Sequence, residues 1–136
     1  MKKRIFSFIL AVLMILTFNV GAHAETAVQP RLSYGDEVSP GLTVSSSKYA
    51  TSTVSIEGIS GVTTRIEATM TLQKKGLFRW SDVTSWTFST TNSNIDYTKT
   101  YGPVDNGTYR VYVTCTFYSG SANETVTQTS ASVKVS

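Results

Sequence analysis

Alternating apolar and polar residues are the dominant pattern of the chain from Leu42 onward. The clearest run spans residues 63–73, where every second residue belongs on the same side of an extended strand; these are Thr64, Ile66, Ala68, Met70 and Leu72. Strict alternation with a period of two predicts a strand with one dry face and one wet face, as in an antiparallel sheet. No segment beyond Leu42 has the 3.6-residue period of an amphipathic helix.

Other runs of the same kind, separated by polar or glycine-containing turns, predict further strands. They span residues 42–47, 50–59, 79–90, 95–101, 109–118 and 124–135. In the last of them we expect the inward side chains to be Thr129, Ala131, Val133 and Val135. Seven short alternating strands predict an all-β fold, a seven-stranded sandwich of two antiparallel sheets that occupies residues 42–136.

The sixth predicted strand carries the candidate contact residues. Its inward set is apolar and consists of Tyr109, Val111, Val113, Cys115 and Phe117. Its outward set includes Arg110, Tyr112 and Tyr118, with threonines between them. A row of exposed tyrosines beside hydroxyl groups predicts a surface that stacks on sugar rings or anchors a protein partner. The alternative is that these are half-covered surface rings without a ligand.

A D-x-G-x-Y motif, made of Asp105, Gly107 and Tyr109, opens the same strand. It resembles the tyrosine corner of immunoglobulin-like sandwiches, in which the tyrosine hydroxyl bonds to the backbone a few residues upstream. In antibody domains a cysteine follows two residues after the tyrosine, and Val111 stands at that position here. The resemblance therefore implies an immunoglobulin-like sandwich without the antibody disulfide.

The N-terminus has the features of an export signal. Basic residues at 2–4 precede an apolar run over residues 5–20, and Ala22-His23-Ala24 follows it. This order is typical of a secretory signal peptide, so we expect residues 1–24 to be removed and the protein to be secreted. The alternative is that the apolar run remains as a membrane anchor, although it is short for a span of about 20 residues.

Residues 25–41 have mixed polarity and include Pro30, Gly35 and Pro40. They predict an extended leader that lies over the surface or is partly disordered. No cysteine follows the expected cleavage site directly, and residues 130–136 are not a hydrophobic tail. We therefore expect a freely released extracellular protein with no membrane span after cleavage.

Charge and composition narrow the choice of partner. The full chain has 12 Lys+Arg and 9 Asp+Glu, a formal net charge of +3. Loss of residues 1–24 removes three basic residues and leaves nine of each sign. A neutral domain has little attraction for nucleic acid, so no nucleic-acid partner is expected. Residues 25–136 contain 20 Thr and 17 Ser, which suits strands with exposed polar faces.

Residues for catalysis or metal binding are scarce. The one histidine, His23, belongs to the predicted signal peptide, which leaves no histidine for a catalytic triad or a metal site. The carboxylates are scattered along outer faces and turns, so they predict neither a glycosidase pair nor a calcium site. Cys115 is expected to be a small buried hydrophobe; its alternatives are an intermolecular disulfide or a reactive nucleophile. The sequence predicts no enzyme activity, no cofactor and no metal.

Several segments of the sequence are similar to those of another group of proteins. They are Leu72-Gln73-Lys74-Lys75, Trp80-Ser81-Asp82-Val83, Ser85-Trp86, Lys99-Thr100-Tyr101 and Gly107-Thr108-Tyr109-Arg110-Val111. In these segments the chain resembles small secreted single-domain proteins of Gram-positive gut anaerobes, an uncharacterised family. The resemblance implies export and the sandwich fold, and it supplies no catalytic residues.

Taken together, these features predict a secreted, non-catalytic interaction module. We expect it to bind an extracellular glycan or protein through a sheet face or loops, with Tyr112, Tyr118 and Arg110 as candidate contacts. One alternative is a self-assembling surface or fibre subunit, in which residues 25–40 add a strand to a neighbour. Another is a secreted toxin or antibacterial effector.

Overall fold

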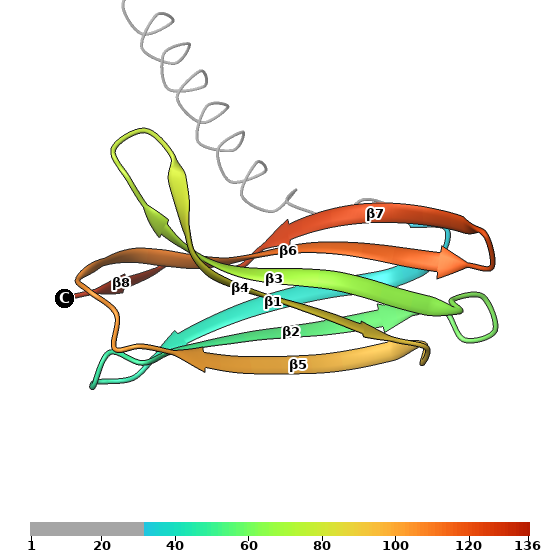
Figure 1. Ribbon diagram of the computed structural model, residues 1–136, viewed down its shortest axis with the longest axis horizontal. Coiled ribbons are helices and arrows are strands. Elements are labelled where there is room, and N and C mark those ends of the chain that lie inside the picture. The colour runs from blue at the N-terminus through green and yellow to red at the C-terminus, as the bar shows by residue number, and fades with distance from the viewer. Residues whose placement is uncertain (1–31) are drawn as a thin grey trace, which may run out of the picture. The chain divides into compact units, whose positions relative to one another are not determined.

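The computed structural model describes residues 32–136 (Figure 1). The predicted signal peptide at 1–24 lies outside the described residues, as do residues 25–31 of the expected leader. The strands are β1 (Gly35–Val44), β2 (Ala50–Gly58), β3 (Arg65–Lys75), β4 (Trp80–Thr90), β5 (Asn94–Tyr101), β6 (Gly107–Ser119), β7 (Ala122–Thr129) and β8 (Val133–Val135). Within this described part, no helix is long and apolar enough to cross a membrane.

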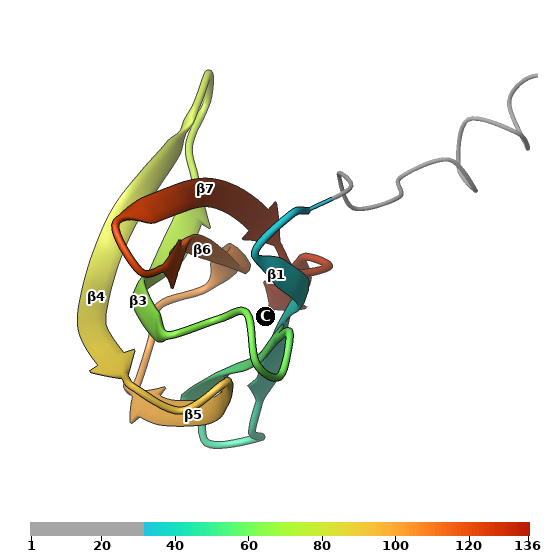
Figure 2. The same cartoon turned by 90° about the vertical axis from the view of Figure 1, so that its right-hand side faces the viewer.

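The strands form two antiparallel sheets that face each other as a sandwich (Figure 2). The smaller sheet has the strand order β1-β2-β5, and the larger sheet has the order β4-β3-β6-β7. Strand β6 holds the larger sheet together, because β3, β7 and β8 all pair with it. The predicted all-β sandwich is confirmed, with eight strands in place of seven.

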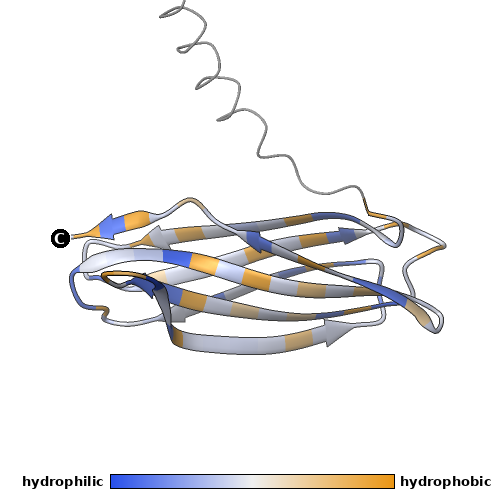
Figure 3. Cartoon of the chain, turned by 90° about the horizontal axis from the view of Figure 1, so that it is seen from above, coloured by the Kyte–Doolittle hydropathy of each residue, from blue (hydrophilic) through white to orange (hydrophobic). Residues whose placement is uncertain are grey.

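The core lies between the two sheets. The residues predicted to point inward from the third and sixth strands are buried, except Thr64, which is exposed. They meet buried side chains of the smaller sheet, namely Val38, Ala50, Val54 and Ile56. Apolar positions recur in bands along the strands (Figure 3). At one side, Phe88 of β4 stacks on Tyr97 of β5 with ring centroids 4.0 Å apart, which joins the edges of the two sheets.

Strand β1 starts earlier than the residue pattern predicts. The pattern indicates an extended leader through residue 41 and a strand from Leu42, whereas β1 begins at Gly35 and pairs with β2 along Gly35–Val44. Val38, near the end of the expected leader, is fully buried in the core. The prediction of an extended leader is therefore wrong for residues 35–41, which belong to the smaller sheet.

Contacts from distant strands fix this early start. The carboxylate of Glu124 in β7 accepts the backbone N–H groups of Ser33, Tyr34 and Gly35. Gly35 also lies against the ring of Phe117, with which an added Cβ would clash. These contacts come from β6 and β7, which are far away in the sequence. The local sequence around Gly35, with its proline and glycine residues, therefore does not predict the strand.

The predicted last strand, 124–135, is two strands. Between β7 and β8, Ser130 bonds to β6 through both its backbone and its side chain. Its N–H donates to the Val111 carbonyl at 2.9 Å, and its hydroxyl accepts the Val111 N–H at 2.8 Å. Between β7 and β8 the register on β6 shifts by one residue, from the Tyr112–Thr129 pair to the Tyr109–Val133 pair. The prediction that Thr129 and Ala131 point inward is wrong, because both are exposed, while the two valines of β8 are buried or half-buried.

The tyrosine that opens β6 makes the contact that its motif predicts. The Tyr109 hydroxyl donates to the carbonyl oxygen of Asp105 at 2.8 Å. The Tyr109 ring is buried with Ala50, Leu72 and Val104 in a small apolar cluster at this end of the sandwich. This contact ties the β5–β6 connection to the core.

Candidate functional site

The outer face of the larger sheet is a lattice of hydroxyl groups. Strand pairing aligns Thr87, Thr69, Thr114 and Thr127 in one row across β4, β3, β6 and β7. The rows beside it are Ser85, Thr71, Tyr112 and Thr129, and Ser89, Glu67, Thr116 and Thr125. Neighbouring strands lie about 4.8 Å apart and alternate residues about 6.7 Å apart, so the lattice is regular. We call the residues of these three rows the hydroxyl face. Among them, Glu67 carries a carboxylate and Thr71 is buried.

The middle of the hydroxyl face is a shallow depression. Its volume is about 190 Å³, and it is lined by Glu67, Ala68, Thr69, Thr87, Thr114 and Thr116. Two pairs of hydroxyls bond across strands, with 3.3 Å between Thr69 and Thr87 and 2.9 Å between Thr116 and Thr125. Since each hydroxyl can donate and accept, the lattice can exchange hydrogen bonds with the hydroxyls of a ligand.

One end of the hydroxyl face is held by a network around Tyr118. The guanidinium of Arg65 lies over the Tyr118 ring, 4.1 Å from its centroid. The Tyr118 hydroxyl donates to Glu67 Oε2 at 3.0 Å, and Arg65 Nη1 pairs with Glu67 Oε1 at 3.3 Å. Both the ring and the hydroxyl of Tyr118 therefore have partners within the protein.

The opposite end carries a group of planar side chains at the base of the β3–β4 hairpin. The guanidinium of Arg110 lies 4.2 Å from the centroid of Trp80. Arg110 Nε donates to Gln73 Oε1, and Gln73 Nε2 donates to Asp82 Oδ1, both at 2.9 Å. Tyr112 follows Arg110 on the same face of β6 and is half-buried. We call these five residues the planar cluster; its hydrogen bonds and ring contact fix the guanidinium.

The three predicted contact residues fall into two separate groups. Arg110 and Tyr112 come together in the planar cluster. Tyr118 lies six residues farther along β6, about 20 Å away for an extended strand, and belongs to the Glu67 network. All three are half-buried. The tyrosines share a face, as the alternation predicts, but they are too far apart to form one stacking platform.

A second exposed feature, the tip of the β3–β4 hairpin, is not predicted by the alternation of apolar and polar residues. Leu77 and Phe78 are 95% and 98% exposed. The loop closes through a bond from the Gly76 N–H to the Arg79 carbonyl at 2.8 Å. Two perpendicular views show the hairpin standing clear of the sandwich (Figures 1 and 2). The signal in the sequence is a pair of large apolar residues inside a turn, where polar residues are usual.

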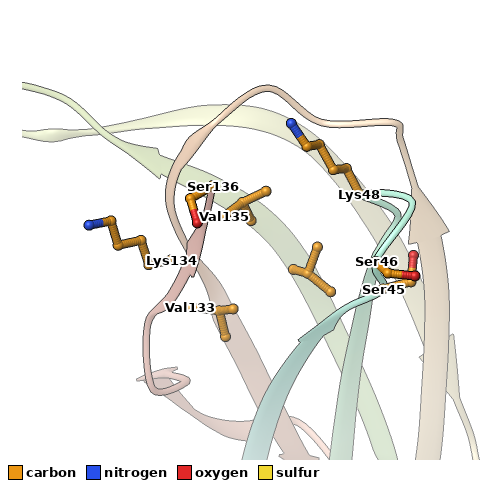
Figure 4. A pocket seen from close by; sticks show the side chains of 8 residues that line it. Ser45, Ser46, Lys48, Val133, Lys134, Val135 and Ser136 are labelled. Carbon is orange, nitrogen blue, oxygen red and sulfur yellow. The ribbon is translucent and has the colours of Figure 1, made fainter.

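A small hollow lies between the β1–β2 turn and β8 (Figure 4). It is lined by Val44, Ser45, Ser46, Lys48, Val133, Lys134, Val135 and Ser136. Its volume of about 180 Å³ is below the roughly 300–1,000 Å³ of pockets that bury small molecules. The Lys48 ammonium already donates to Asn106 Oδ1 at 2.6 Å. We assign no ligand to this hollow.

Cys115 is fully buried in the core, as its place on the inward face predicts. Burial raises the pKa of its thiol to about 12, so the thiol stays protonated at neutral pH. A protonated and inaccessible thiol is a poor nucleophile. Across residues 32–136, no three His, Cys, Asp or Glu side chains lie close enough together to hold a metal ion.

Two features of the described surface stand out for their chemistry, the hydroxyl face with its planar cluster and the hairpin tip. Their separate chemistries, hydroxyl-rich in one case and apolar in the other, suit different partners. No family model, curated protein or solved structure matches the chain.

Proposed function

We propose that the protein is a secreted, non-catalytic interaction module that binds an extended glycan along the hydroxyl face and the planar cluster. The observation that carries the proposal is the alignment of hydroxyl side chains across four strands in three rows, with Glu67 as the one carboxylate among them. Export rests on the basic, apolar and A-x-A pattern of residues 1–24. An exported protein meets glycans on cell surfaces and in the surrounding medium.

The chemistry of this face supports a sugar ligand. Serine and threonine hydroxyls donate and accept, as sugar hydroxyls do. Arg110 and Gln73 add planar donors already held by their neighbours, so binding costs them little conformational entropy. The Tyr112 ring offers apolar surface to the carbon face of a sugar. Because the face is open and about 20 Å long between Tyr112 and Tyr118, it suits a chain of sugars better than a single sugar.

We also propose that the sandwich is of the immunoglobulin-like type. In the constant-type domain, the first, second, fifth and fourth strands share one sheet, and the third, sixth and seventh share the other. The order here follows this scheme, except that β4 pairs with β3 instead of β5. The hydrogen bond from Tyr109 to Asp105 at the start of β6 supports the same type.

A glycan array tests the proposal. We expect the protein to bind at least one extended glycan, and a Thr69→Val, Thr114→Val variant to bind it about 10-fold more weakly. The substitution keeps the side-chain shape and the strand propensity and removes two hydroxyls from the central row. An Arg110→Ala, Tyr112→Ala variant should lose binding as well, because it removes the guanidinium and the ring.

The matched control removes the same groups from the other sheet. Thr53 and Thr98 are paired on the outer face of β2 and β5, so Thr53→Val with Thr98→Val should leave glycan binding unchanged. The proposal fails if every glycan is silent, if both valine pairs act alike, or if the hydroxyl face captures a protein partner instead.

The structure bears on the self-assembly alternative. That alternative requires residues 25–40 to add a strand to a neighbour, but residues from Gly35 onward already pair with β2 of the same chain. Strand donation by this segment would require β1 to leave its own sheet and the Glu124 carboxylate to release its three N–H groups. This cost makes the alternative the weaker proposal.

A further inference from the structure

We infer that the tip of the β3–β4 hairpin inserts peripherally into an anionic lipid bilayer. This inference goes beyond glycan binding and uses a different surface. Leu77 and Phe78 form the tip, and they are exposed over 95% and 98% of their surface. Adjacent apolar side chains held in water at such exposure mark a contact site. The tip is a wedge of two side chains and does not need a matching pocket in its partner.

The hairpin is shaped to reach a surface ahead of the rest of the domain. It leaves the sandwich at its base and projects away from both sheets (Figures 1 and 2). Arg110 over Trp80, and the chain of bonds through Gln73 to Asp82, hold this base against β6. An apolar pair on such a projection can enter a bilayer before the sandwich touches the headgroups.

Cations lie directly behind the apolar tip. Lys75 and Arg79 flank the two apolar residues, and both side chains are exposed. We call these two residues the collar. Lys74 does not belong to it, because its ammonium lies over the Tyr109 ring, 5.8 Å from the centroid. The acid closest to the tip along the hairpin, Asp82, accepts a hydrogen bond from Gln73. An apolar end followed by a cationic collar matches the order of layers in an anionic bilayer, with acyl chains inside and phosphates outside.

The same charges disfavour the other possible occupants. Two copies that met tip to tip would bring their cationic collars together, and like charges repel. A stable protein interface buries about 800 Å² on each partner, which is more than two side chains on a narrow hairpin present. A bilayer with anionic headgroups satisfies both the apolar tip and the collar.

Vesicle sedimentation tests the apolar tip. We use the protein recovered from the culture medium, with vesicles of phosphatidylglycerol and phosphatidylcholine in equal parts or of phosphatidylcholine alone. Wild-type protein should sediment with the anionic vesicles. Leu77→Ser with Phe78→Ser should lower the partition coefficient at least about 10-fold, because it removes most of the apolar transfer energy. Both side chains are exposed, so the urea unfolding midpoint of the variant should equal that of the wild type.

A second pair of variants tests the collar. Lys75→Gln with Arg79→Gln should weaken binding to the anionic vesicles about 10- to 30-fold, with little change on neutral ones. Lys99→Gln with Lys134→Gln removes the same charge from other parts of the sandwich and should have a much smaller effect. Higher salt should weaken wild-type binding, because the collar is exposed.

A fluorescent label locates the inserted residue. Cys115 is buried, so a Leu77→Cys variant can be labelled at the tip alone with a polarity-sensitive dye. Its emission should shift to the blue on anionic vesicles. A Ser121→Cys variant, labelled in the β6–β7 turn, should show no shift.

Each result either supports the inference or overturns it. The inference is overturned if the wild type stays in the supernatant, or if the Leu77→Ser, Phe78→Ser variant sediments equally well. It is also overturned if this variant keeps vesicle binding and loses only the binding of a protein partner or self-association. Residues 1–31 are the same in every variant, so they cannot produce the difference. The Thr69→Val, Thr114→Val variant should keep vesicle binding, and the tip variant should keep glycan binding, so the two proposals fail separately.

Discussion

Thr63 and Ser52 have buried hydroxyl groups in contrasting surroundings. The Thr63 hydroxyl accepts the Ile59 N–H at 2.8 Å and donates to the Tyr34 carbonyl. The Ser52 hydroxyl is fully buried on the inner side of β2, and within the described residues it has no hydrogen-bond partner. A buried hydroxyl without a partner has lost its hydration and gained no bond in exchange, so it lowers the stability of the fold.

Replacing Ser52 by alanine should therefore stabilise the protein. We expect Ser52→Ala to raise the free energy of unfolding by about 1 kcal/mol, the desolvation cost of one unpaired hydroxyl. Urea denaturation, monitored by tryptophan fluorescence, measures this change in the free energy of unfolding. Ser55→Ala, on the outer side of the same strand, is the control and should change stability by less than about 0.5 kcal/mol. A marked loss of stability in Ser52→Ala would show that the hydroxyl is bonded.

Among the strands, β1 depends most clearly on a contact from far along the chain. The carboxylate of Glu124 gathers the N–H groups of three consecutive residues at the start of β1. Hydrogen bonds to a charged acceptor are stronger than those to a neutral one. This carboxylate therefore helps to hold the first strand in the smaller sheet, next to the edge of β7.

Removal of this carboxylate should loosen the start of β1. We expect Glu124→Ala to lower the free energy of unfolding by about 2 kcal/mol, since half-buried N–H groups lose their acceptor. Hydrogen exchange of Tyr34 and Gly35 should accelerate more than that of the β3 amides. Glu57→Ala, on an exposed side chain of β2, is the matched control. Equal losses of stability in both variants would contradict this role of Glu124.

The elements differ in how far their sequence predicts them. Strands β3 and β6 are recognised from alternation alone, because each has one face in the core and one in solvent. The start of β1 and the break between β7 and β8 are not, because Glu124 and Ser130 decide them through side-chain bonds to other strands. The hairpin tip was missed for another reason: Leu77 and Phe78 lie in a turn and contribute to no periodic pattern.

At the scale of the whole molecule, Cys115 makes the free energy of unfolding depend on pH in the alkaline range. Burial raises the pKa of its thiol from 9.0 to about 12. Above pH 9 the unfolded chain loses this proton while the folded protein keeps it, so unfolding releases a proton. The contribution of the protonated thiol to the free energy of unfolding is fully present below pH 9, and it is lost as the pH rises toward 12.

The free energy of unfolding should therefore fall between pH 9 and 12. The thiol contributes a slope of up to about 1.4 kcal/mol per pH unit. Urea denaturation at several pH values checks it, with Cys115→Ala as the reference. Both proteins share every other titratable group, so the difference between the two curves isolates the thiol. Parallel curves would contradict a buried, protonated Cys115.

The binding surfaces also need the whole molecule. Each strand shows its own alternation of threonine and serine, but the row of Thr87, Thr69, Thr114 and Thr127 exists only because β4, β3, β6 and β7 pair in that order and register. The same pairing gives Tyr118 its partners Arg65 and Glu67 from β3, which the alternation of β6 alone does not reveal.

The sequence by itself determined the all-β class, the inward faces of β3 and β6, the buried thiol and the tyrosine contact that opens β6. These features follow from local periodicity and turn chemistry, which act between residues close in the chain. Only the tertiary structure decided where β1 begins, where the last strand breaks, which hydroxyls form rows and which apolar residues stay in water. Those outcomes depend on pairing between strands far apart in sequence, and no local pattern encodes which partner each strand meets.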